Sequence, residues 1–172
     1  MELLEIMKQR RSVRQYKDIP IPEEILTKIM DAGLLAPTSM NRRPCRFFLV
    51  TDKDMLAKIS CVKKSGGQFV KDAAACAAVF GDEAIADTWM EDASIALSFM
   101  MLEAQEKGIG SCWVQIAMRK GEDGSDAEAN LRALFNVPDT YRCAGILALG
   151  YAAKQPVSHE VSDEERSKVT II

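Results

Sequence analysis

Residues 82–107, DEAIADTWMEDASIALSFMMLEAQEK, form the longest segment of this kind in the chain, with no proline or glycine and with apolar residues every three or four positions. This spacing predicts one long helix. Between Ala93 and Leu102 only Ser94 and Ser98 interrupt the apolar residues. A helix that is apolar on nearly all sides must be covered on more than one side. We expect the second cover to be another copy of the protein, and the alternative is a simple central core helix.

Strands and shorter helices are predicted on both sides of this helix. Residues 73–80 are an almost continuous apolar run, typical of a central strand that is covered on both faces. Further strands are predicted at 46–51, 111–116 and 143–149. Further helices are predicted at 2–9, at 22–33, at 52–59, and between Ser125 and Pro138, the last with a capping box formed by Ser125 and Glu128. The alternation of helices and strands predicts a single α/β or α+β domain over residues 1–172, in which 152–172 form a C-terminal tail.

Composition and charge exclude several classes of protein. The sequence is 48% hydrophobic and 27% charged, as in an ordinary globular protein. A net charge of -3, with basic residues interspersed among acidic ones, argues against a nucleic-acid partner. The longest apolar runs fall short of the roughly 18 residues that would span a membrane. The first residues lack the apolar core of a signal peptide, so we expect a cytoplasmic protein with no membrane partner.

The cysteines and the single histidine offer no obvious metal or hydrolase site. The five cysteines are far apart and never form a C-x-x-C pair, so no metal site is expected. Cys76, Cys112 and Cys143 lie in apolar runs, where a free thiol behaves as a small buried hydrophobe. His159 lies in the polar tail, away from any marked nucleophile, which argues against a Ser-His-Asp or Cys-His hydrolase.

Three arginines and a serine are concentrated in QRRSVR, residues 9–14. After the first predicted helix, the alternation of apolar and polar residues over 13–16 predicts extended chain. Alternate residues of an extended chain share one face, so Arg10, Ser12 and Arg14 are expected to converge on a single anion. Guanidinium groups bind oxyanions bidentately, and the hydroxyl adds a donor. The alternative is that these cations only complement the dipole at the end of the first helix.

Four separated segments carry a family resemblance. They are RRSVR at 10–14 with Tyr16, APTSMN at 36–41 with Pro44, the stretch from DASIA at 92–96 to GIGSCW at 108–113, and residues 141–151. In this order and spacing they resemble the FMN-dependent nitroreductase-like flavoproteins. The resemblance implies an α+β fold with a central mixed sheet flanked by helices, and with the long apolar helix at a dimer interface. It also implies FMN as cofactor and NADH or NADPH as co-substrate.

The resemblance further implies which residues bind FMN. Those implied to hold the phosphate are Arg10, Ser12 and Arg14, with Arg11 adding backbone or ring contacts. Those implied to come from the partner subunit of a homodimer, and to line the flavin ring and ribityl chain, are Pro37, Thr38, Ser39 and Asn41. Those implied to pass beside the isoalloxazine, with a backbone amide near its N5, are Trp113, Val114, Gln115 and Ile116.

The chain departs from the family pattern at three places. Many members have Gln-Pro-Trp where this chain has Arg43-Pro44-Cys45, so Arg43 is expected to add a cation near the ring. The segment 80–92 is too short for the lid helices of larger relatives. Arg166 and Lys168 correspond only loosely to the basic pair that contacts the phosphate in the family, and their role stays open.

The implied reaction takes place on the flavin, and no catalytic side chain is predicted. Hydride from NADH or NADPH goes to flavin N5, and a nitroaromatic, quinone or related small acceptor then enters the same cleft in a ping-pong cycle. Two other possibilities stay open. One is a different flavin reaction on the same fold, such as dehalogenation, dehydrogenation or flavin fragmentation. The other is a flavin-binding protein without catalysis.

Overall fold

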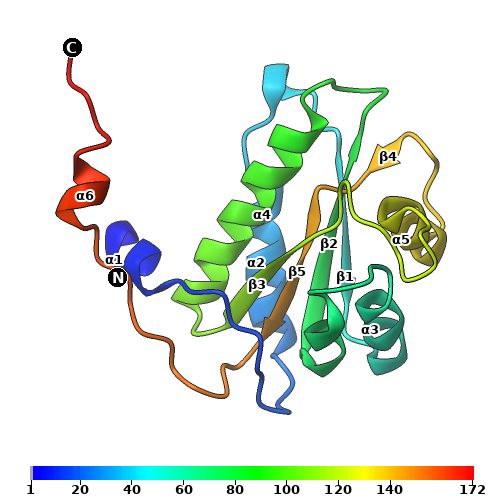
Figure 1. Ribbon diagram of the computed structural model, residues 1–172, viewed down its shortest axis with the longest axis horizontal. Helices are drawn as coiled ribbons and strands as arrows, with labels where there is room; N and C mark the ends of the chain where they lie inside the picture. Colours follow the sequence, from blue (N-terminus) through cyan, green and yellow to red (C-terminus); the bar gives the residue numbers. More distant parts are fainter. Residues whose placement is uncertain (1) are drawn as a thin grey trace.

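A five-stranded sheet forms the centre of the protein in the computed structural model, which describes residues 2–172 (Figure 1). The strands lie in the order β1 (Cys45–Val50), β2 (Ala75–Asp82), β5 (Gly145–Gly150) and β3 (Gly110–Gln115), with the short β4 (Tyr141–Arg142) paired to the end of β2. All of these strand pairs are antiparallel. A parallel bridge between Ser12 and Ser111 adds the N-terminal segment to the outer edge of β3, which makes the sheet mixed.

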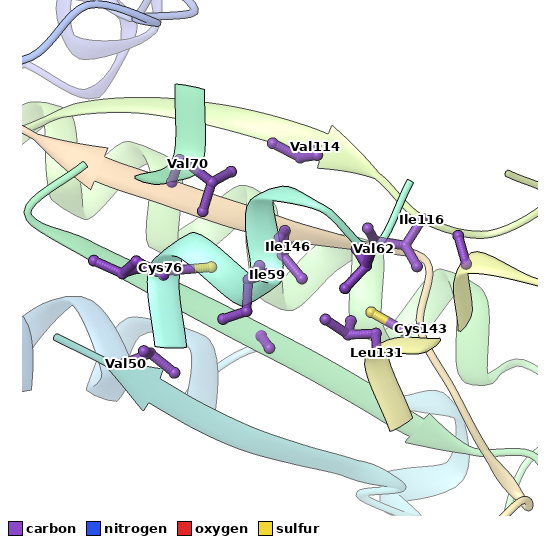
Figure 2. Close-up of a cluster of buried hydrophobic side chains, with 14 of the residues drawn as sticks. Val50, Ile59, Val62, Val70, Cys76, Val114, Ile116, Leu131, Cys143 and Ile146 are labelled. Carbon is purple, nitrogen blue, oxygen red and sulfur yellow. The ribbon is translucent and has the colours of Figure 1, made fainter. Parts of the chain in front are cut away.

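Helices cover both faces of the sheet (Figure 1). The helices α2 (Glu23–Leu34) and α4 (Trp89–Glu106) pack against one face, and α3 (Lys53–Ser60) and α5 (Ala127–Phe135) against the other. Every residue of β2 is buried, as its continuous apolar sequence predicts. Side chains of β2 alternate between the two layers, and Figure 2 shows the core on the α3 and α5 side, where Cys76 and Cys143 pack among aliphatic residues. The predicted α+β fold is therefore confirmed.

The two ends of the chain lie together beside this core. The first helix, α1 (Leu3–Gln9), and the short α6 (Asp163–Arg166) are neighbours at one side of the molecule (Figure 1). The His159 N–H donates to the Lys8 carbonyl at 2.8 Å, and the Lys8 ammonium lies 3.2 Å from the Glu160 carboxylate. Two short 3-10 helices, η1 (Ser39–Asn41) and η2 (Gln68–Asp72), complete the fold. Between residues 2 and 172, no helix is both long enough and apolar enough to cross a membrane.

The long helix begins later than its sequence predicts. We expected it from residue 82, but α4 starts at Trp89. Asp82 still belongs to β2, where it pairs with Tyr141. Its carboxylate accepts the Ala84 N–H at 3.0 Å, a local bond that favours a turn over a helix. Residues 83–88 therefore form a connection, and the helix begins only after it.

The capping box predicted at α5 is wrong. Asp126 caps this helix, because its carboxylate accepts the N–H groups of Glu128 and Ala129 at 3.0 and 3.1 Å. Ser125 bonds elsewhere, donating its hydroxyl to Asp123. The Glu128 side chain points into the protein and accepts two bonds from Arg142, each at 3.0 Å. The Glu128 carboxylate, which the local pattern assigned to the helix cap, thus binds Arg142 of β4 instead.

Candidate functional site

The basic segment is held in extended form against the start of β3. The Val13 N–H donates to the Ser111 carbonyl at 2.9 Å, and the Tyr16 hydroxyl donates to the Val13 carbonyl at 2.6 Å. The Val13 side chain is buried against Gly110, where an added Cβ would lie 2.9 Å from a Val13 methyl carbon. Only glycine allows this close approach. The sequence therefore fixes residues 10–14 to the sheet through the one apolar residue among them.

Three side chains of this segment gather around one thiol. Burial raises the pKa of the Cys112 thiol, and that rise is opposed by Arg14, by a hydrogen bond to Ser12 and by Arg10. Arg10, Ser12 and Arg14 are thus close enough to Cys112 of β3 to affect its pKa. Ser12 and Arg14 are exposed to solvent, as is Arg11. Two guanidinium groups and a hydroxyl in one neighbourhood can together hold a phosphate.

The free edge of β3 lies next to this cluster. On its inner side the strand pairs with β5, and just beyond its end the Ile116 N–H donates to the Ala144 carbonyl at 3.1 Å. Backbone groups of an antiparallel strand alternate between its two edges. Since Ser111 bonds outward to Val13, the N–H groups of Trp113 and Gln115 also point to the outer edge. They are donors that a planar heterocycle can use.

The side chains of this strand divide between the two layers of the core. Val114 and Ile116 are buried on the α3 and α5 side, and their backbone N–H groups point inward, away from the free edge. Trp113 packs on the α4 side, where its indole N–H donates to the Gln115 side-chain oxygen at 2.9 Å. This bond orients both side chains. Of the four predicted strand residues, Trp113 and Gln115 are therefore the ones positioned to contact a ligand at the edge.

Lys63 lies beside this strand, a position that the sequence did not indicate. It follows α3, is only 8% exposed, and donates its ammonium proton to the Gln115 carbonyl at 2.9 Å. Burial lowers its pKa, and the nearby Arg119 lowers it further, while Cys112 acts in the opposite sense. No signal in the sequence distinguishes it from its neighbour Lys64, because a lysine pair is usually solvated.

The loop at 36–44 has a strained backbone. Met40, Asn41 and Arg43 have positive φ angles of 51°, 55° and 50°. Residues other than glycine rarely adopt this conformation, and such strain gathers at functional sites. Within the loop, Arg43 donates its Nε proton to the Asn41 side-chain oxygen at 3.0 Å, and its backbone N–H to the Thr38 hydroxyl at 3.1 Å. The loop is therefore rigidly shaped by its own side chains.

A buried carboxylate anchors this loop to the first turn of α4. The Asp92 side chain accepts the Ser39 N–H at 2.9 Å and the Thr88 hydroxyl at 3.4 Å. A cavity of about 310 Å³ lies beside the anchor and is lined in part by Thr38 and Arg43. Pro37, just before the anchored residues, is exposed. The predicted residues Pro37, Thr38, Ser39, Asn41 and Arg43 are thus brought together as one unit.

The loop and the basic segment lie at opposite ends of α4. Ser39 bonds to Asp92 near the start of the helix, whereas Val13 packs on Gly110 just beyond its end. At 1.5 Å per residue, the 18 residues of this helix separate them by roughly 27 Å. In Figure 1, η1 lies near the top of α4, and the blue N-terminal segment passes near the lower half of that helix. Within one chain, the two sets of predicted residues do not meet.

Comparison with known proteins identifies close relatives. The Nitroreductase family profile matches residues 7–68 and 62–151. A putative NADH dehydrogenase/NAD(P)H nitroreductase of Methanothermobacter thermautotrophicus is 34% identical over 96% of this chain and 85% of its own length. The solved structure of an FMN-dependent nitroreductase from Clostridium difficile R20291 is 38% identical, covers 98% of both chains, and has a TM-score of 0.94. A putative nitroreductase from Desulfovibrio desulfuricans, solved in complex with FMN, is 26% identical over 96% of this chain and 95% of its own, with a TM-score of 0.79.

Proposed function

Since this chain belongs to the nitroreductase family, we propose that it is an FMN-dependent oxidoreductase that uses NADH or NADPH to reduce a small acceptor. The acceptors proposed are nitroaromatics, quinones and related compounds. Bound FMN would supply the chemistry, by taking a hydride at N5 and passing it on in a ping-pong cycle. The observation that carries the proposal is the cluster of Arg10, Ser12 and Arg14 beside the free edge of β3.

The residues present fit both ends of FMN. A phosphate needs cations and hydroxyl donors, and Arg10, Ser12 and Arg14 supply them on one side of the extended segment. The flavin ring needs directed donors, and the outward N–H groups of Trp113 and Gln115 supply them from the rigid strand beside it. Backbone donors on a sheet edge are fixed before the ligand arrives, so little ordering is required on binding.

The proposed site is shared between two subunits. The loop at 37–43 lies about one helix length from the phosphate cluster of its own chain, too far for both to contact one FMN. A second copy packed along α4 would bring its loop to this cluster. Apolar side chains lie exposed on α1, on α2 and its C-cap, and on α4, where such a copy would pack; they are Leu3, Leu4, Met7, Leu34, Leu35, Ile95 and Phe99. A patch of this kind is typical of an obligate interface.

The direct test is to add FMN to the purified protein and to follow NADH or NADPH oxidation with a panel of nitroaromatic and quinone acceptors. We expect a yellow, FMN-loaded protein that oxidises at least one of the two nicotinamides only when an acceptor is present. A protein that takes up no FMN would refute the proposal. FMN binding without turnover would leave a flavin-binding protein that is not an oxidoreductase.

The shared site has a test of its own. The variants Arg10→Ala and Asn41→Ala are each expected to be impaired. When the two are unfolded together and refolded as a mixture, half of the dimers carry one of each chain. In each of these, one site has both changes and the other has neither, so about a quarter of the wild-type sites should return. If mixing restores nothing beyond the average of the two variants, each site lies within one chain.

A further inference from the structure

Lys63 is a buried cation without a counter-anion. Its residue is 8% exposed, although lysine is rarely buried unless it is paired. Among residues 2–172 its ammonium has one hydrogen-bond acceptor, the neutral Gln115 carbonyl, and it takes part in no salt bridge. An ammonium has three donors, so two of them remain for another partner. Its adjacent neighbour Lys64 shows the ordinary alternative, with a side chain 66% exposed and 3.7 Å from Glu122.

The surroundings of Lys63 make this burial costly. Arg119 is close enough to disfavour the charged form, and burial disfavours it more. Removing a charge from water without a compensating partner costs several kcal/mol in general. The fold holds Lys63 there nonetheless: Gly67 packs against its stem, with its ideal Cβ position 3.4 Å from the Lys63 Cγ. A group that accepts hydrogen bonds and gains negative charge would offset the cost.

Lys63 lies where such a group is expected. Its ammonium touches the same residue, Gln115, whose N–H points to the free edge of β3. Arg10 and Arg14, in the segment beside β3, are near enough to affect the pKa of Cys112 on the same strand. The proposed phosphate contacts and Lys63 thus lie beside the same strand, β3, and the outward backbone N–H of Trp113 lies between them.

We propose that Lys63 is a further cofactor-site residue, whose buried ammonium faces the flavin ring and stabilises its reduced state. This inference rests on the proposed function. Hydride transfer from a nicotinamide delivers two electrons and one proton. The ring therefore becomes negatively charged unless it takes up a second proton. A fixed cation in a site of low dielectric stabilises that charge more strongly than water does, whereas the neutral oxidised ring gains much less.

The experiment measures the two redox states separately. The variants are Lys63→Met, which keeps the length of the side chain without the charge, and Lys64→Met as the matched control. For each, the dissociation constant of oxidised FMN is measured by fluorescence titration, and the midpoint potential of the bound flavin by equilibration with a reference dye. We expect Lys63→Met to lower the preference for reduced over oxidised FMN by about tenfold, which is a fall of about 30 mV for a two-electron couple. Lys64→Met should leave the potential unchanged.

The outcomes separate the possible roles of Lys63. A purely structural lysine would weaken both redox states equally when removed, so an unchanged potential in Lys63→Met overturns the inference. Lys63→Arg should retain the potential, and Lys63→Gln, which keeps a donor for the Gln115 carbonyl, should lower it and serves if the methionine variant does not fold. A wild-type protein that binds no FMN overturns the proposed function itself, which is a different result from an FMN-loaded variant with an unaltered potential.

Discussion

Removing the Glu128 carboxylate should destabilise the protein far more than removing Glu83, although both bind Arg142. The Glu128 side chain is 4% exposed and accepts two bonds from the Arg142 guanidinium, each at 3.0 Å, in a bidentate pair. It also accepts the buried Cys143 N–H at 3.0 Å. Glu83 is 44% exposed and accepts one bond from Arg142 at 2.9 Å. The two glutamates thus bind the same arginine, but the Glu128 side chain is buried and the Glu83 side chain is exposed.

The magnitude follows from what each change leaves behind. In Glu128→Ala, the guanidinium loses its buried partner and the Cys143 N–H loses its acceptor in the core. A buried N–H left without an acceptor costs about 1–3 kcal/mol, and bonds to a charged group contribute about 1.5–3 kcal/mol, with the lower value expected here because Arg142 is 35% exposed and keeps Glu83. In Glu83→Ala, solvent replaces the lost contact, and an exposed ion pair contributes only about 0–1 kcal/mol. At roughly 2–4 °C per kcal/mol for a chain of this size, Glu128→Ala should unfold at least about 5 °C lower than the wild type.

Thermal unfolding monitored by circular dichroism, at one protein concentration for all variants, measures the difference. The concentration must match because association shifts an unfolding midpoint. Burial and charge can be separated with Glu128→Gln, which keeps an acceptor for the Cys143 N–H and should fall between the wild type and Glu128→Ala. Equal destabilisation by the two alanine variants would refute the reasoning, since it would mean that burial of the pair makes no difference.

Three other variants test separate parts of the structure. Gly110→Ala places a Cβ within 2.9 Å of Val13, so the unfolding free energy should fall by about 1–3 kcal/mol and FMN binding should weaken. Normal stability together with normal FMN binding would contradict the proposed packing of residues 10–14 against β3. Asp92→Ala removes the acceptor for the Ser39 N–H, so FMN binding should weaken by about tenfold in a fluorescence titration; an unchanged affinity would mean that the loop does not contact FMN. Burial raises the pKa of the Cys76 thiol from 9.0 to about 12. Its contribution to the free energy of unfolding is therefore complete below pH 9. Between pH 9 and 12 that contribution should fall by about 1.4 kcal/mol per pH unit, because the thiol then ionises only in the unfolded chain. Cys76→Ala should show a shallower decline in urea unfolding over that range, and an identical slope would rule this out.

Patterns that depend on near neighbours were sufficient to predict most of the fold. The apolar run at 73–80 appears as the fully buried β2, because burial on both faces leaves no place for polar residues. The three-and-four spacing predicted α4, and its surplus of apolar residues appears as exposed Ile95 and Phe99 on the helix. The expected convergence of Arg10, Ser12 and Arg14 on one anion also rests on a local property, the alternation of an extended segment, and it stays a prediction.

Features that depend on partners far along the chain were not predictable in this way. Ser125 and Glu128 have the spacing of a capping box, yet Glu128 binds Arg142, which is 14 residues away and comes from a strand. Asp126 stands next to Ser125 and supplies the cap instead. A short local motif offers a carboxylate one partner, whereas the whole fold offers several. For Glu128, the bidentate interaction with Arg142 is stronger than a single bond at the helix cap.

The prediction of the candidate site divides along the same line. Arg10 and Arg14 could be proposed from the sequence because one segment carries both of them. Lys63 could not be found, because 52 residues separate it from Gln115 and its burial depends on how the loop after α3 folds against β3. The Lys63 side chain makes this contact at the edge of the sheet and is buried there, while the Lys64 side chain beside it remains in solvent. No salt bridge in the described chain balances the Lys63 charge, and the paired variants at Lys63 and Lys64 test directly the proposal that a ligand at that edge does so.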